Sequence, residues 1–504
     1  MTVLVLGDQL TRQVGPLADR PDERVLMVEA REFAARHPYH PHKRTLVASA
    51  MRHFRDALRD AGRAVDYHVV ETFADGLDAH FDAHPGDSLT VMRPSSHGAA
   101  DRLRDLVTER GGTLDVVENE LFLCSPAEFD DWYAENSLQH EDFYRWMRRE
   151  TGYLLEDGDP VGGAWNFDEA NRETPPTDYE APEIPEYPPD ETTKRVQREW
   201  SERDTDEWAD PEAFRWPVTR ADALDALADF CEHRLPDFGP YEDAMVTEEW
   251  ALDHALLSPA LNLGLLHPAE VAEAAIDAYH EREDVPVESV EGFVRQIIGW
   301  REFVRHVYRV GMPNLADANR LDAERALPDV YWDGDTEMAC LATAIEGVRE
   351  RGYAHHIQRL MVLSNFGLLY GVDPHELNRW FHVAFVDGYH WVSTPNTVEM
   401  GQYAADLFAT KPYAASANYI ERMSDHCAEC PYDPDATVGD DACPFNALYW
   451  DFLADHEDEL RSNHRMGLVY GHLDDKRDAD ELAGIRERAA DVREGVRSGD
   501  VERE

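Results

Sequence analysis

The sequence predicts an N-terminal α/β domain with a doubly wound parallel sheet, followed by an all-α domain. Three observations support this prediction. In the first 125 residues, short apolar runs alternate with helical stretches, as in parallel sheets whose strands are joined by helices. Residues 173–191 read ETPPTDYEAPEIPEYPPDE, and this density of proline and acidic residues predicts an extended connector. After about residue 221 the apolar spacing is helical and no convincing strand follows.

Five apolar runs are the expected strands of the sheet. Residues 43–61, between the second and third runs, repeat an apolar side chain at every fourth position, and residues 101–110 end at a Gly-Gly helix stop. Parallel sheets bind ligands beyond the carboxyl ends of their strands, which directs attention to residues 7–10, although no glycine-rich phosphate motif follows them. The runs are Val3–Leu6, Val25–Val28, Val65–Val70, Leu89–Met92 and Leu114–Val117.

Residues 374–386 illustrate the helical region. Asp373 is a good N-cap and Pro374 suits the first helical position. An apolar stripe then runs along one face until Gly388 ends the helix. We therefore expect four parts of the chain. They are an α/β domain at 1–130, a connector at 131–220, a helical domain at 221–473 and a charged peripheral tail at 474–504.

The net charge of −54 comes from 102 acidic and 48 basic residues. Only four residues are lysines, which leaves 48 − 4 = 44 arginines. An acidic excess with few lysines is typical of halophilic proteins, which work in molar salt where the Debye length is about 3 Å. An acidic surface ordinarily repels nucleic acid. Here the charge reflects the solvent and does not exclude DNA as a partner.

Targeting and cysteine content place further limits on the class of protein. No stretch reaches the roughly 20 apolar residues of a membrane span, and the N-terminus lacks the basic region of a signal peptide. We expect a cytoplasmic protein with no membrane partner. Six cysteines in 504 residues are too few for a disulfide scaffold.

Four of the cysteines have the spacing of a metal site. Cys427 and Cys430 form a C-x2-C pair, Cys443 follows 13 residues later, and Cys340 lies 87 residues upstream of the pair. Four thiolates hold either zinc or an iron–sulfur cluster, and the spacing does not choose between them. The alternative is that these cysteines are small buried apolar residues. We prefer that alternative only for the other two, Cys124 and Cys231.

Two helical segments carry polar residues that an ordinary core does not explain. In residues 254–264 a serine, an asparagine and a glycine could hold a pyrophosphate, although a plain helix connection is the alternative. In residues 296–303, Gln296, Trp300 and Phe303 share one helical face, beside the polar Arg301 and Glu302.

A third segment, residues 355–361, places His356 and Arg359 on one helical face, so both could reach a single ligand. A histidine that titrates near neutrality suits general acid catalysis. The adjacent His355 faces another way, which argues against a histidine pair binding a metal. The alternative is an ordinary hydrogen-bonded histidine within a helix.

Eight blocks of sequence extend these motifs over nearly the whole chain. On these blocks the protein resembles the iron–sulfur bacterial cryptochromes and photolyases, a photolyase-related family that includes the prokaryotic (6-4) photolyases. The blocks are GDQL at 7–10, SAMRHF at 49–54, PVGGAWNFD at 160–168, VEGFVRQIIGWREF at 290–303, YAHHIQRLM at 353–361, Pro395-Asn396, KPYAASANY at 411–419 and CPFNALYWDF at 443–452.

The resemblance implies the photolyase/cryptochrome architecture, with an antenna-binding N-terminal domain and a helical FAD-binding domain. It implies a 4Fe–4S cluster on Cys340, Cys427, Cys430 and Cys443. An Arg359–Asp387 pair beside the flavin would stabilise reduced, anionic FAD. The implied flavin contacts are Ser258, Gln296, Arg359, Asp387 and Asn396, with Trp380 and Trp332 as the inner and outer electron donors for photoreduction.

An antenna, 6,7-dimethyl-8-ribityllumazine, is also implied in the N-terminal domain. The segment after Glu29 departs from the family pattern. The residues expected beside the antenna are Asp8, Gln9, Glu29, Glu32 and His40.

The implied activity is light-driven repair of ultraviolet-damaged DNA, single- or double-stranded, by a monomer. Excited reduced FAD would pass an electron to a 6-4 photoproduct that has been flipped out of the duplex, since a stacked lesion cannot meet the flavin. His356 would protonate the lesion as general acid, and Glu302 and Tyr413 would contact the flipped bases. The expected phosphate contacts are Arg301, Lys411, Arg461 and Arg465.

Two departures from the family leave other functions open. Phe381 stands where many members have tyrosine after the proximal tryptophan, and Ser393 stands where some have glutamate near the flavin N5. Phenylalanine cannot be oxidised at useful potentials, so electron hopping would be slower or take another route. The alternatives are a cryptochrome-like photoreceptor that binds FAD without repair, a cyclobutane-dimer photolyase, and a zinc-stabilised structural protein.

Overall fold

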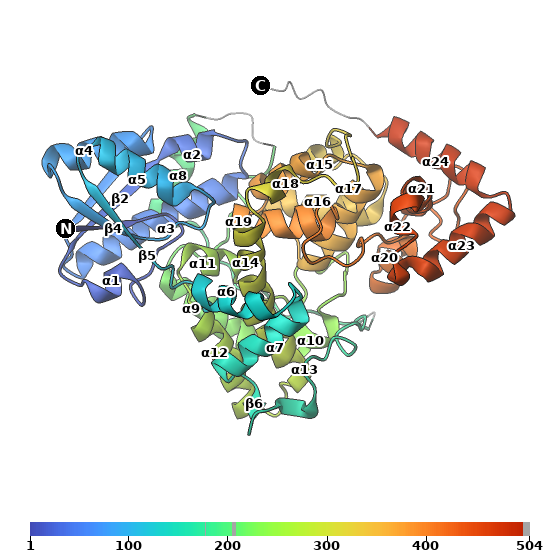
Figure 1. Ribbon diagram of the computed structural model, residues 1–504, viewed down its shortest axis with the longest axis horizontal. Helices are drawn as coiled ribbons and strands as arrows, with labels where there is room; N and C mark the ends of the chain where they lie inside the picture. Colours follow the sequence, from blue (N-terminus) through green and yellow to red (C-terminus); the bar gives the residue numbers. More distant parts are fainter. Residues whose placement is uncertain (177, 204–207, 497–504) are drawn as a thin grey trace.

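The computed structural model describes residues 1–176, 178–203 and 208–496, and it contains a five-stranded parallel sheet at the N-terminal end (Figure 1). The strand order is β3-β2-β1-β4-β5, with β1 pairing in parallel with both β2 and β4. This order confirms the predicted doubly wound sheet. The strands are β1 (Thr2–Val5), β2 (Arg24–Ala30), β3 (Val65–Val70), β4 (Ser88–Met92) and β5 (Thr113–Val117).

Helices pack on both faces of this sheet, which explains why the inner strands β1, β2 and β4 are largely apolar along their length rather than at alternate positions. Val25 and Met27 share a hydrophobic cluster with Leu46 of α3. Leu26, which points to the opposite face, shares another with Leu77 of α4. The helices of this domain are α1 (Pro16–Asp19), α2 (Arg31–Ala35), α3 (Pro41–Asp60), α4 (Phe73–Ala83) and α5 (Ala99–Glu109), and α8 (Glu191–Ser201) packs on α3.

The first part of the helical region contributes to the hydrophobic core that also lies against one face of the sheet. Two of its helices are continued by π-helical turns, η2 (Phe230–Arg234) after α9 and η3 (Arg295–Arg301) after α13. The elements are α6 (Pro126–Glu135), α7 (His140–Thr151), β6 (Leu155–Glu156), β7 (Asp159–Pro160), η1 (Val161–Gly163), α9 (Arg220–Asp229), α10 (Leu235–Tyr241), α11 (Ser258–Leu263), α12 (Pro268–Glu281), α13 (Val287–Val294) and α14 (Glu302–Gly311).

The second part of the helical region has a separate core. Asp373 caps α18 by accepting from the His375 backbone N, as the sequence predicts. The elements are η4 (Asn314–Asp317), α15 (Val330–Asp333), α16 (Ala339–Arg351), η5 (Gln358–Ser364), α17 (Asn365–Tyr370), α18 (Pro374–Ala384), α19 (His390–Thr394), η6 (Pro395–Gly401), α20 (Ala417–Met423), η7 (His426–Ala428), α21 (Pro444–Asp455), α22 (Glu457–Leu460), η8 (His464–Met466), α23 (Gly467–Asp478) and α24 (Leu482–Gly495).

Two of the expected boundaries are wrong. Within the expected connector, Phe143 and Tyr144 of α7 are fully buried in the first helical core. Within the expected tail, Ile485, Ala489 and Val492 bury one face of α24, which packs on α21. The charged residues around this narrow apolar stripe concealed it in the sequence. Residues 181–190 do run without helix or strand, as a connector should.

None of the described helices is both long enough and apolar enough to cross a membrane.

Candidate functional site

A buried ion pair joins three segments of the helical region. The Arg359 guanidinium in η5 donates to both carboxylate oxygens of Asp387, at 3.0 and 3.1 Å. Ser258 Oγ at the start of α11 donates to Asp387 Oδ2 at 2.6 Å, and Asn262 Nδ2 donates to the Asp387 carbonyl oxygen at 3.0 Å. Asp387 is only 5% exposed. Charge-assisted, bidentate bonds of this kind fix both groups in one orientation.

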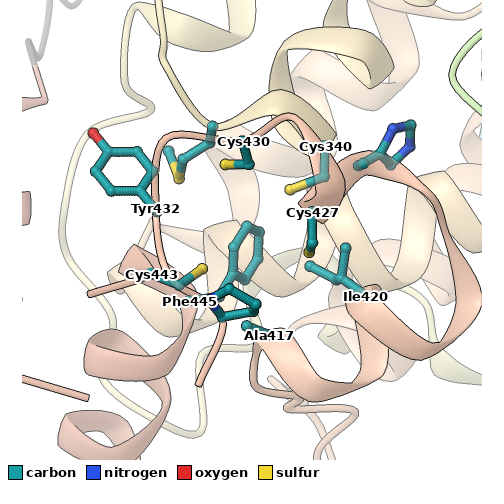
Figure 2. A pocket seen from close by; sticks show the side chains of 11 residues that line it. Cys340, Ala417, Ile420, Cys427, Cys430, Tyr432, Cys443 and Phe445 are labelled. Atoms are coloured by element: carbon teal, nitrogen blue, oxygen red, sulfur yellow. The ribbon is translucent and has the colours of Figure 1, made fainter. Parts of the chain in front are cut away.

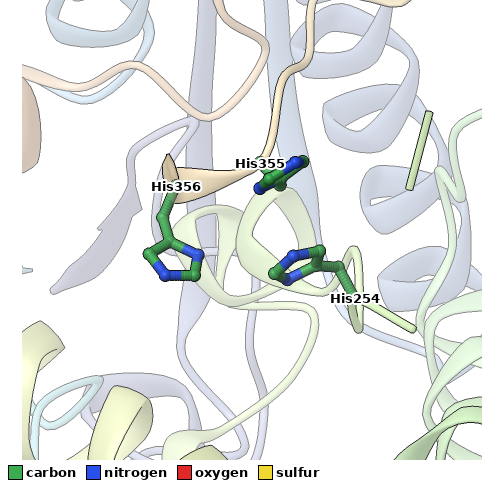
Figure 3. A group of neighbouring side chains, drawn as sticks. All are labelled: His254, His355 and His356. Carbon is green, nitrogen blue, oxygen red and sulfur yellow. The ribbon is translucent and has the colours of Figure 1, made fainter. Parts of the chain in front are cut away.

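Three imidazole rings, from His254, His355 and His356, lie together (Figure 3), and the His355 carbonyl oxygen accepts a hydrogen bond from the Arg359 backbone N. The His355 ring stacks on His254 with centroids 4.6 Å apart, and the His356 ring meets His254 edge-on at 5.4 Å. Burial is the main cause that lowers the pKa of both His254 and His355. The His356 side chain is 44% exposed, and its Nε2 lies 3.4 Å from Asp243 Oδ1. His356 is therefore the member of the triad that is exposed to solvent.

Gln296 of η3 also belongs to this neighbourhood. Its Nε2 donates to Glu242 Oε1 at 2.6 Å, and burial raises the pKa of Glu242. Trp300 instead stacks on His140 with centroids 3.7 Å apart, and Phe303 meets the same ring edge-on. Gln296 and Trp300 both lie in the π-helical η3, and the shared face of Gln296 with the two aromatic residues stays a prediction.

Asp253 precedes the triad and is a second buried carboxylate, 2% exposed. The Tyr179 hydroxyl lies 2.9 Å from each of its oxygens, which attaches the connector to the helical region. Desolvation raises the pKa of Asp253 to about 7. Among the described side chains no arginine or lysine donates a hydrogen bond to Asp253, in contrast to Asp387.

We predict that Asp253→Asn removes a pH dependence of stability between about pH 4 and 7. A carboxyl whose pKa is raised on folding stabilises the protein below its unfolded pKa, and that contribution disappears as the pH rises through the folded pKa. A rise to about 7 corresponds to at most about 4 kcal/mol. The measurement is urea unfolding at pH 5 and pH 8 in the same salt. We expect the free energy of unfolding of the variant, relative to that of wild type, to be higher at pH 8 than at pH 5. An identical pH dependence in both proteins would contradict the assignment.

Glu302 is not available to a ligand, so its predicted contact with flipped bases is wrong. The residue is completely buried. Its Oε2 accepts from the backbone N atoms of Leu123 and Cys124, each at 3.0 Å, and its Oε1 pairs with Arg301 Nη1 at 3.1 Å. The sequence shows the acidic residue but not the loop at 121–124 that packs on it.

The predicted phosphate contacts and Tyr413 have different outcomes. The Arg301 guanidinium lies over Phe122 at 4.3 Å within the core, so its predicted phosphate contact is wrong. Arg461 already pairs with Glu457 and with Asp474. Tyr413 is 37% exposed, as a contact with substrate requires. Lys411 and Arg465 are also exposed. For the last three residues the predicted roles stay predictions.

Aromatic rings form a path from the ion pair towards the surface. Arg359 lies over Phe385 at 4.2 Å, and Phe385 meets the fully buried Trp380 at 5.6 Å. Trp380 meets Tyr331, and its Nε1 donates to the Tyr331 carbonyl oxygen at 3.0 Å. The neighbouring residue, Trp332, contacts Trp208 with ring centroids 5.1 Å apart. Trp208 has no sequence signal, because it lies in the connector.

One of the two residues that depart from the family, Phe381, lies beside this path. Phe381 stacks on Phe385 with centroids 5.2 Å apart and nearly parallel rings. Ser393 is buried. Asn396 donates from its Nδ2 to the Val392 carbonyl oxygen at 2.9 Å, within its own helical segment. No bond joins Asn396 to the Arg359–Asp387 pair among the described contacts, so its flavin contact stays a prediction.

The residues expected beside an antenna lie at the carboxyl ends of β1 and β2, with His40 farther along. Asp8 and Gln9 follow β1, and Gln9 Nε2 donates to the Met92 carbonyl oxygen at 3.0 Å. Glu29 pairs with Arg52 at 2.7 Å and bonds to the Tyr67 hydroxyl. The other two have backbone partners. They are Glu32, which accepts from Phe73 N, and the fully buried His40, which lies 3.2 Å from the Arg349 carbonyl oxygen.

The four cysteines with metal-site spacing meet at one pocket (Figure 2). Cys340 belongs to α16, Cys427 to η7, and Cys443 is the N-cap of α21, so three separate segments converge here. Burial and the neighbouring sulfurs raise the pKa of Cys427 to about 12, so a cation is needed to hold these groups together as thiolates. The other lining residues are Met338, Ala417, Ile420, His426, Tyr432, Pro434 and Phe445.

The spacing of these sulfurs distinguishes between kinds of metal centre. Among the described residues, no three of the four sulfurs lie within 4.8 Å of one another. A tetrahedral zinc ion with bonds of about 2.3 Å holds its thiolates about 3.8 Å apart. The pocket is therefore wider than a single ion requires. Cys124 and Cys231 are buried in the first helical core, as predicted for small apolar residues.

Comparison with known proteins adds to this geometry. The family model described as deoxyribodipyrimidine photo-lyase-related protein matches residues 3–216. A (6-4) photolyase of Agrobacterium fabrum is 41% identical over 478 residues, which are 93% of this chain and 94% of that protein.

Solved structures share the fold at low sequence identity. A bacterial class III photolyase from Agrobacterium tumefaciens has a TM-score of 0.58 and 18% identity, over 84% of this chain and 83% of that one. A cryptochrome from Synechocystis has a TM-score of 0.57 and 15% identity, over 90% and 89% of the two chains. The fold alone thus occurs in proteins called photolyases and in proteins called cryptochromes.

Proposed function

The chain belongs to the deoxyribodipyrimidine photo-lyase-related protein family, and on that premise we propose that it is a light-dependent, FAD-containing enzyme that repairs 6-4 photoproducts in DNA. The observation that carries the proposal is the exposed His356, set beside the buried Arg359–Asp387 pair. The (6-4) photolyase that is 41% identical over nearly the full length supports the same reaction.

The residues around the ion pair fit a flavin. Arg359 offers a fixed positive charge to an anionic ring, and Asp387 holds it in place. Two buried nitrogens nearby, His254 Nε2 and His355 Nδ1, have no hydrogen-bond partner among the described residues, so polar groups remain for a ligand to satisfy. Bound FAD would supply a light-excited electron donor. In this proposal Ser258, Arg359 and Asp387 hold it, with Gln296 and Asn396 as further contacts.

The chain itself would supply proton transfer and exclude water. His356 donates a proton to the lesion, and Asp243, 3.4 Å from its Nε2, orients the ring. His254 and His355 line the site behind His356 as uncharged rings, since burial lowers the pKa of both. The lesion must leave the duplex to reach His356. The exposed Tyr413, Lys411 and Arg465 are the proposed contacts to the flipped bases and their phosphates.

We propose that Cys340, Cys427, Cys430 and Cys443 hold a 4Fe–4S cluster. The width of the pocket supports a cluster over a single zinc ion. The proposed cluster joins α16, the segment at 426–430 and α21, and so stabilises the second helical core. We also propose a ribityllumazine antenna near Asp8 and Gln9, which is supported by their place at the carboxyl end of the central strand β1.

A photoreceptor without repair activity is the second candidate. The observation that favours it is the pair of departures from the family. Phe381 packs against Trp380 where many members have a redox-active tyrosine, and the buried Ser393 replaces the glutamate that some members have near the flavin N5. The fold is also that of a Synechocystis cryptochrome.

A lesion assay separates these functions. Purified protein, reduced and kept in molar salt, is mixed with oligonucleotides that carry one 6-4 photoproduct or one cyclobutane dimer. We expect blue light to remove the 6-4 photoproduct and to leave the cyclobutane dimer, with no loss of either in the dark. Loss of the cyclobutane dimer alone would show that the substrate is the cyclobutane dimer and not the 6-4 photoproduct. No loss of either lesion by FAD-loaded protein would favour the photoreceptor.

A further inference from the structure

A second cluster of ligand-type side chains lies in the N-terminal domain, at the amino ends of the strands and so opposite the edge proposed for the antenna. Asp66 comes from β3, His80 from α4, and His84 is the C-cap of α4. Asp66 Oδ2 lies 3.5 Å from His80 Nδ1 and 3.3 Å from His84 Nε2. The three ligand atoms all lie within 4.8 Å of one another.

The buried His80 ring faces a carboxylate on each side. Its Nε2 lies 3.3 Å from Asp87 Oδ2, and its Nδ1 faces Asp66. Asp87 is paired with the terminal ammonium at 3.0 Å and accepts from the Thr2 hydroxyl at 2.6 Å. A neutral imidazole carries one proton. In either tautomer, therefore, one ring nitrogen presents a lone pair to a carboxylate.

A cation between Asp66 and His80 would remove the repulsion between the imidazole lone pair and the carboxylate. His80 is 1% exposed, and its Nδ1 has no hydrogen-bond partner among the described residues. With the proton on Nε2 directed at Asp87, the Nδ1 lone pair is free to bind a metal. A carboxylate behind a ligating histidine is the usual arrangement in such sites.

The geometry suits a tetrahedral ion. Zinc bonds to imidazole nitrogen and carboxylate oxygen are about 2.0–2.2 Å long, which places neighbouring ligand atoms about 3.4 Å apart. Two of the three separations here, 3.3 and 3.5 Å, already have that length. Two nitrogens and one oxygen favour a borderline metal such as zinc over magnesium or calcium.

We propose that Asp66, His80 and His84 bind a zinc ion that ties the end of α4 to the edge strand β3. His84 and Asp66 are 31% and 25% exposed, which gives the ion a path from solvent and leaves the fourth position to water. Arg24 Nη1, 3.0 Å from Asp66 Oδ1, turns the other carboxylate oxygen towards the ion.

Zinc binding to the full-length protein with its cofactors tests the proposal. Equilibrium dialysis against zinc chloride, followed by metal analysis, is applied to wild type, Asp66→Asn, His84→Gln and a control, His280→Gln, whose histidine is exposed on α12. We expect wild type and control to bind one more equivalent of zinc than the two ligand variants, and apparent affinity to fall at least tenfold in those variants. Equal zinc content in all four proteins would overturn the proposal.

X-ray absorption at the zinc edge gives a second readout. We expect nitrogen and oxygen neighbours only. A sulfur shell that persists in His84→Gln would place the zinc on cysteines and overturn the assignment. Because Asp66 and His84 are partly exposed, their variants should fold, and unchanged FAD and iron content checks this. If Asp66→Asn is unstable, His84→Gln decides the question.

Discussion

His356→Ala should retain FAD and lose at least about a hundredfold in the rate of 6-4 photoproduct repair. General acid catalysis by a positioned side chain contributes about 10²–10⁴ to a rate, and His356 is the exposed ring of the triad. The measurement is lesion loss under blue light at fixed photon flux, normalised to bound FAD. His472→Ala, which removes an exposed histidine of α23, is the matched control and should repair like wild type.

Two results would contradict this role for His356. If the variant repairs the lesion within a factor of two of the wild-type rate, His356 is not the general acid. Loss of FAD from the variant would show that the ring supports the cofactor site instead. Asp243→Asn separates orientation from chemistry, because it keeps the His356 ring but removes the carboxylate 3.4 Å from its Nε2. We expect a smaller loss of repair in this variant than in His356→Ala.

The sequence predicts the sheet well because the inner strands β1, β2 and β4 are buried on both faces and so are largely apolar along their length. It also predicts that Arg359 and Asp387 belong together, through the resemblance to a family, and the structure joins them by two hydrogen bonds. The resemblance likewise brought Cys340 together with cysteines 87 and more residues away, which local spacing alone could not do.

The errors have a common physical cause. Glu302 is polar and lies in a family block, yet its partners are backbone N–H groups of a loop nearly 180 residues earlier. Trp208 and the Asp66–His80–His84 cluster gave no signal, because their neighbours come from distant segments or meet only when α4 packs on β3. Periodicity reports which face of a helix is buried. It does not identify the residues that pack against that face.

Asp387→Asn should lose FAD and lower stability. The change keeps the shape of the side chain but removes the charge that compensates Arg359, whose two nitrogens both donate to Asp387. Breaking a buried ion pair by removing one partner costs about 3–5 kcal/mol, because the remaining charge is left uncompensated. FAD retained after gel filtration and the midpoint of urea unfolding are the measurements. We expect iron content to be kept, since the cysteines lie in a separate pocket.

Asp253→Asn is the matched control for this prediction, because it makes the same chemical change at a carboxylate that is equally buried. Asp253 has a tyrosine hydroxyl as its partner, whereas Asp387 has a guanidinium. Above pH 7 the loss of charge should therefore stabilise the protein at position 253 and destabilise it at position 387. If both variants shift the unfolding midpoint in the same direction at pH 8, the Arg359–Asp387 pair does not stabilise the site through its charge.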